Sequence, residues 1–148
     1  MNTHPYLRAY MAGIVFPTLV LLVVLTAFCI ARFVYQVPVP IERVIIFPMA
    51  LVPSLFGVWN MFYLWLRPHP HLPIGFHGAL LPFVMVPVGI ALAGRLGLVT
   101  VGSSGLMCLD QHIVPYQYVA LAFTIGVIIY YLAWKYLVGF FNQVLGIA

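Results

Sequence analysis

The chain has 148 residues, of which 65% are hydrophobic and only 5% are charged. A water-soluble domain carries about 25% charged residues, so six basic and two acidic side chains are too few to coat a globule of this size. The basic residues form no run, which argues against nucleic acid as a partner. The composition therefore favours an integral membrane protein.

Four stretches without charged residues are long enough to cross a membrane as helices, and they cover residues 10–31, 44–66, 78–94 and 115–134. About 20 helical residues span the ~30 Å hydrocarbon core. The stretches lack the alternation of barrel strands, and the first is too long for the apolar core of a signal peptide. We therefore predict an all-α fold, a single polytopic domain over residues 1–148 that forms a bundle of four transmembrane helices.

Prolines recur in the second and third predicted helices. Each helix has one proline near its start and another five residues deeper, Pro48 with Pro53 and Pro82 with Pro87. The deeper proline removes an internal hydrogen bond, so Pro53 and Pro87 are predicted to kink their helices and are candidate hinges. The alternative is that they are ordinary prolines of membrane helices, where neighbouring helices repair the backbone.

The connection between the second and third predicted helices contains three histidines, His69, His71 and His77. An H-x-H pair with a third histidine nearby has the residue types for a Zn, Cu or haem site. The segment has no cysteine or acidic partner, however, and its prolines restrict how the rings converge. We therefore favour a solvated interfacial loop and expect no cofactor, with the metal or haem site as the alternative.

The connection over residues 96–114 is the longest and is rich in glycine and serine, so we predict a mobile loop there. Cys108 lies in this loop, and Cys29 lies near the end of the first predicted helix. Both are expected at the same membrane face. A disulfide between them is left open.

Polar side chains within the predicted helices are the candidate ligand-binding or pore-lining residues. Asn60 shares a helical face with small residues and should point at a neighbouring helix, as a binding-site amide or as a packing hydrogen bond. The fourth helix carries a polar stripe with spacings of seven, seven and four residues, which consists of Gln117, Thr124, Tyr131 and Lys135. This stripe either lines a solute path or joins helices through hydrogen bonds.

Small residues four apart let helix backbones approach closely, within the bundle or between copies of the chain. Such pairs are Ala9/Gly13, Gly89/Ala93 and Ala122/Gly126. The basic residues divide equally between the two expected membrane faces, so the positive-inside rule leaves a tie. We predict a protein of the bacterial inner (plasma) membrane with both termini in the cytoplasm.

Enzyme motifs are absent from the sequence: it has no paired acids, no Ser-His-Asp set and no P-loop. We therefore expect a non-enzyme that binds or conducts a small neutral or apolar solute or a lipid, as an oligomer. The first alternative is a structural or accessory subunit of a larger membrane complex. The second is a membrane enzyme or metal-binding or haem-binding protein that uses the histidine loop. Membrane lipids, a second copy of the chain or another membrane protein are the expected partners.

Overall fold

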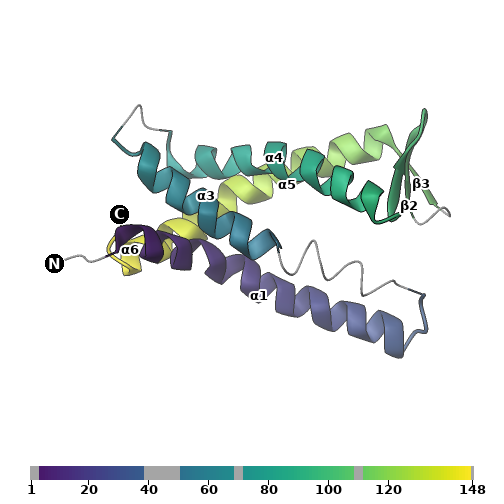
Figure 1. The fold of residues 1–148 in the computed structure, drawn as a ribbon, viewed down its shortest axis with the longest axis horizontal. Helices are drawn as coiled ribbons and strands as arrows, with labels where there is room; N and C mark the ends of the chain where they lie inside the picture. Colours follow the sequence, from purple (N-terminus) through teal and green to yellow (C-terminus); the bar gives the residue numbers. More distant parts are fainter. Residues whose placement is uncertain (1–3, 39–50, 69–71, 109–111, 148) are drawn as a thin grey trace. The chain divides into compact units, whose positions relative to one another are not determined.

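The computed structural model describes residues 4–38, 51–68, 72–108 and 112–147. This part of the chain is mostly helical, and its helices are α1 (Pro5–Phe33), α3 (Val52–Leu66), α4 (Ile74–Arg95) and α5 (Tyr116–Leu132). α5 continues through a π-helical segment, η2 (Ala133–Val138), into α6 (Gly139–Val144) (Figure 1).

Three helical stretches are long and apolar enough to cross a membrane, namely Pro5–Phe33, Ile74–Arg95 and Tyr116–Val144. They agree with the predicted membrane class. The second predicted span, residues 44–66, is covered only from Val52 by α3, because residues 39–50 lie outside the described part of the chain. The complete four-helix bundle therefore stays a prediction.

The membrane-length helices extend beyond the predicted boundaries. α1 begins at Pro5, a residue suited to the first turn of a helix, and it contains Arg8. α4 begins at Ile74, and the fourth predicted helix continues past Lys135 to Val144. A charged residue need not end a membrane helix, because a long basic side chain can reach the interface from within the helix.

A small antiparallel sheet occupies most of the segment that the sequence predicts as a mobile loop. Its strands are β1 (Val99–Val101), β2 (Gly105–Cys108) and β3 (His112–Pro115), in the order β1-β2-β3. Cys108 pairs with His112, and Gly105 pairs with Pro115. The Tyr116 hydroxyl at the start of α5 donates to Gly102 O at 2.6 Å and so joins the β1–β2 turn to the helix.

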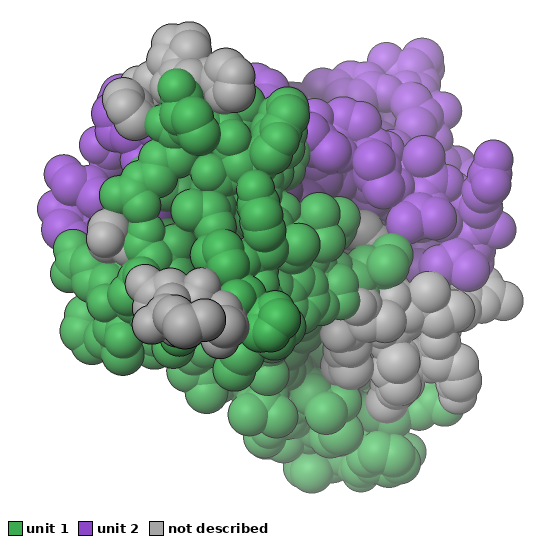
Figure 2. Space-filling view, turned by 60° about the vertical axis from the view of Figure 1, so that its left-hand side comes forward, with its two compact units in different colours: residues 1–71, 137–148 green, residues 72–136 purple. Residues whose placement is uncertain are grey.

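The chain forms two compact units (Figure 2). Unit 1 comprises Met1–His71 with Leu137–Ala148, and unit 2 comprises Leu72–Tyr136. Unit 1 therefore contains α1, α3 and α6, whereas unit 2 contains α4, the sheet and α5. Each unit is described separately below.

In unit 1, α1 and α3 approach closely at small residues. Ala9, Ala12 and Gly13 are buried, and a Cβ added to Gly13 would lie 2.6 Å from the backbone oxygen of Phe56. Small side chains permit this approach of the two backbones. Ile147 belongs to the same buried cluster as Ala9 and Ala12, so the residues that follow α6 pack against α1.

The C-terminal end of α6 is closed by a Schellman turn. Gly146 has a φ of 66°, and its N–H donates to Gln143 O at 3.0 Å. The N–H of Ile147 donates to Asn142 O at 2.8 Å. These two bonds satisfy carbonyls that would otherwise lack partners and direct Ile147 back toward the core.

In unit 2, α4 and α5 lie side by side (Figure 1) and also pack through glycines. A Cβ on Gly75 would lie 2.8 Å from the Tyr131 ring. A Cβ on Gly78 would lie 2.0 Å from the Trp134 side chain, which belongs to η2. The absence of a side chain on α4 therefore makes room for large aromatic rings from the facing helix.

Candidate functional site

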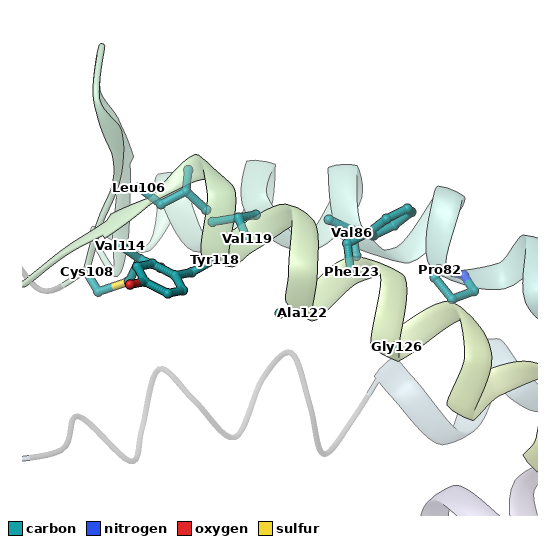
Figure 3. A pocket seen from close by; sticks show the side chains of 10 residues that line it. All are labelled: Pro82, Val86, Leu106, Cys108, Val114, Tyr118, Val119, Ala122, Phe123 and Gly126. Atoms are coloured by element: carbon teal, nitrogen blue, oxygen red, sulfur yellow. The ribbon is translucent and has the colours of Figure 1, made fainter.

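An open pocket of about 400 Å³ lies in unit 2, between α4, α5 and the sheet. Figure 3 shows the ten residues that line it. Pro82 and Val86 come from α4, and the others come from β2, β3 and α5. Nearly all of these side chains are apolar, which is the usual character of a small-molecule pocket.

Small residues of α5 create the empty space. Ala122 and Gly126 both line the pocket, and a Cβ added to Gly126 would meet nothing within 4 Å. This contrasts with Gly78, where an added Cβ would overlap the ring of Trp134. The pair Ala122/Gly126, which the sequence marks as a possible helix contact, therefore opens a cavity within unit 2.

The two ends of the pocket differ in chemistry. Among the described lining residues, only Cys108 and Tyr118 have a heteroatom in the side chain, and both lie at the sheet end (Figure 3). Pro82 and Gly126 lie at the opposite end. Cys108 and Cys29 are both free thiols, so the disulfide between them that the sequence leaves open is not formed in this structure.

Asn60 lies in unit 1, where its buried amide joins three helical elements. Its Nδ2 donates to Ala9 O at 2.7 Å and to Asn142 Oδ1 at 2.7 Å. Asn142 Nδ2 donates back to Asn60 Oδ1 at 3.1 Å. Both N–H donors of Asn60 are thus used within the protein, which favours the packing interpretation over the ligand-binding one.

Asn142 is a polar residue that the sequence does not single out. The predicted fourth helix ends at residue 134, so Asn142 falls outside every predicted span. Its position in α6 follows from the continuation of the helix through η2. The available signal was the charge-free run from Tyr136 to Ala148, which is apolar enough to continue the helix.

The stripe on the last helix does not contribute to the pocket lining. Gln117, Thr124 and Lys135 are exposed, and Thr124 Oγ1 donates to Ala120 O of its own helix at 2.9 Å. Tyr131 is half-buried, with its ring centroid 5.2 Å from that of Phe76 in an edge-to-face contact.

The ammonium group of Lys135 lies over two tyrosine rings. Its Nζ is 5.8 Å from the ring centroid of Tyr131 and 5.2 Å from that of Tyr136. Such cation–π contacts orient the side chain along the helix surface. The role of the stripe as a solute path stays a prediction.

The candidate hinges and metal ligands are only partly described. Pro53 lies in the first described turn of α3, and α4 continues as a helix through Pro87. His69 and His71 lie outside the described residues, whereas His77 is buried in α4 with its ring 5.8 Å from that of Trp134. Among the described residues, no group of three or more His, Cys, Asp or Glu is placed to hold a metal ion.

No family model matches this chain, and neither a characterised protein nor a solved structure matches it. The pocket in unit 2 is the feature that points to a ligand. It combines a volume suited to a small molecule with walls that favour an apolar one.

Proposed function

We propose that this is an integral membrane protein that binds an apolar, lipid-like molecule in the pocket between α4, α5 and the sheet. The observation that carries the proposal is the open space at Gly126, where a helix otherwise rich in large residues leaves a cavity. Transfer of the apolar surface of a ligand from water into such a pocket is favourable.

Several observations favour binding over the alternatives. The candidate metal ligand His77 packs against an aromatic ring, which favours a structural role for this histidine. Asn60 is engaged by protein groups, so the pocket in unit 2 replaces it as the best candidate for contact with a ligand. If the chain is instead an accessory subunit, its specific partner is another protein, and the experiment below should then detect a co-purified membrane protein.

The test is native mass spectrometry of the delipidated protein with 1-dodecanol as the probe. We expect one bound dodecanol per chain in the original protein and at least a tenfold weaker adduct in Gly126→Trp, because the indole fills the pocket. The same spectra report the expected homo-oligomer, since each further copy adds a whole chain mass.

Ala120→Trp is the matched control. Ala120 is exposed on the same helix and does not line the pocket. This variant therefore introduces the same indole side chain but should still bind dodecanol. A thermal melt of both variants in detergent checks that each is folded. Equal adducts in all three proteins, or none in any, would contradict the proposal, and a co-purified membrane protein would favour the accessory-subunit alternative.

A further inference from the structure

The pocket runs along α5 from a polar end to an apolar end. Tyr118 lies in the first turn of the helix, and Gly126 lies eight residues later, which corresponds to about 12 Å at a rise of 1.5 Å per residue. The sheet residues line the Tyr118 end, whereas Pro82 of α4 lies at the Gly126 end (Figure 3). The lining residues therefore extend over about 12 Å of α5, and this pocket is called the slot below.

The polar end of the slot belongs at the membrane surface. A three-stranded open sheet has edge strands whose backbone groups need water or other partners, so it does not lie in the hydrocarbon core. Arg95, the last residue of α4 before the sheet, is exposed, and a basic side chain at the end of a membrane helix suits the headgroup region. The sheet end of the slot is thus at the interface, and the Gly126 end is deeper in the membrane.

A histidine, His112, lies next to a lining residue of the polar end of the slot. His112 of β3 pairs with Cys108 of β2 in the antiparallel register, so the two side chains lie on the same face of the sheet with Cβ atoms about 5 Å apart. Cys108 lines the slot, and His112 is exposed next to it. The imidazole of His112 and the hydroxyl of Tyr118 are hydrogen-bond donors, and they fit a ligand head that presents acceptor oxygens.

We infer that the ligand is a single-chain fatty carboxylate, with its head at His112 and Tyr118 and its tail along Ala122 and Gly126. This inference rests on the proposed function and adds the class and direction of the ligand. The volume of about 400 Å³ is near the small end of ligand pockets, so it suits one chain rather than a two-chain phospholipid.

The direction is tested with two dodecanoic acid probes, one with a photoreactive diazirine near the carboxylate and one with it near the methyl end. After illumination, cross-linked peptides are identified by mass spectrometry. The first probe should label β2, β3 and the start of α5, and the second should label peptides with Pro82 or Gly126. Labelling by both probes should fall at least tenfold in Gly126→Trp.

The outcomes separate this inference from the proposed function. A reversed pattern that still depends on Gly126 would overturn the direction and leave binding intact. Labelling that is equally strong in Gly126→Trp and in the original protein would overturn both the direction and the binding. It would mean that the probes are only dissolved around the helices. Specific binding of dodecanol without dodecanoic acid would overturn the carboxylate head alone.

Substitution of the histidine tests the head group. We expect His112→Ala to weaken the binding of dodecanoic acid on the order of tenfold and the binding of dodecanol by no more than about twofold. The reason is that a hydrogen bond to a charged carboxylate is stronger than one to a neutral hydroxyl. Ile113→Ala is the control, since Ile113 is exposed on the same strand and points to the opposite face of the sheet. Equal losses for both probes in His112→Ala would show that the histidine only holds the sheet together.

Discussion

The amides of Asn60 and Asn142 form a reciprocal pair that is almost completely shielded from solvent, with 0% and 3% of their surface exposed. Asn60 also binds Ala9 O, so the pair connects α1, α3 and α6. Each amide satisfies the other, which matters because an unpaired polar group buried away from water is costly. The pair is therefore part of the packing of unit 1.

Asn60→Ala is expected to lower the free energy of unfolding by about 1–3 kcal/mol, because it leaves the amide of Asn142 buried without its partner. Asn142→Ala should act similarly. In the double variant the free energy of unfolding should fall by about 1 kcal/mol less than the sum of the two single losses, because the two amides interact directly. Reversible unfolding in SDS mixed micelles measures all three, and strictly additive losses would contradict the pairing.

The sheet shows how an element depends on one small residue. A Cβ on Gly105 would lie 2.2 Å from the backbone oxygen of Val114 on the neighbouring strand. Only glycine therefore permits the approach of β2 to β3 at this point. The sheet in turn supplies Cys108 to the pocket wall and places His112 beside it.

Gly105→Val should separate β2 from β3 and leave the helices in place. Hydrogen–deuterium exchange is expected to show loss of amide protection in Gly105–Cys108 and His112–Pro115, with protection in α4 unchanged, because the helices satisfy their own backbones. Gly102→Ala is a milder control, since its added Cβ would lie 3.3 Å from Gly105 O. Protection that persists in Gly105→Val would refute this sheet register.

At the scale of the whole molecule, unit 1 brings both ends of the chain together. Arg8 Nη1 donates to Leu145 O at 3.4 Å, and Arg67 donates to Ile147 O. The beginning of α1 and the end of α3 thus meet the carbonyls after α6, where a positive charge is favourable. Figure 1 shows the start of α1 next to α6.

Both termini should therefore lie on the same side of the membrane, and we expect that side to be the cytoplasm. Fusions of green fluorescent protein to either end in a bacterial host should fluoresce, and alkaline phosphatase fusions should be inactive. Opposite results at the two ends would contradict the contact between Arg8 and Leu145. Active phosphatase at both ends would reverse the orientation but keep the shared side.

The candidate site was only partly accessible from sequence. Ala122/Gly126 was recognised as a small-residue pair, yet the same pattern at Ala9/Gly13 packs against α3. The pattern alone does not distinguish a filled contact from an empty slot, because this depends on what faces it. The strands were missed because they have only three or four residues each, too few for a clear alternation among the glycines and serines.

The sequence by itself determined the membrane class and the approximate position of the three long helices, because hydropathy is a local property that a segment of about 20 residues carries alone. Only the tertiary structure decided that Asn60 meets Asn142, 82 positions away, and that the space beside Gly126 stays open. These features depend on the surfaces that helices and strands present to one another. Such surfaces are set by close packing, which no single segment encodes.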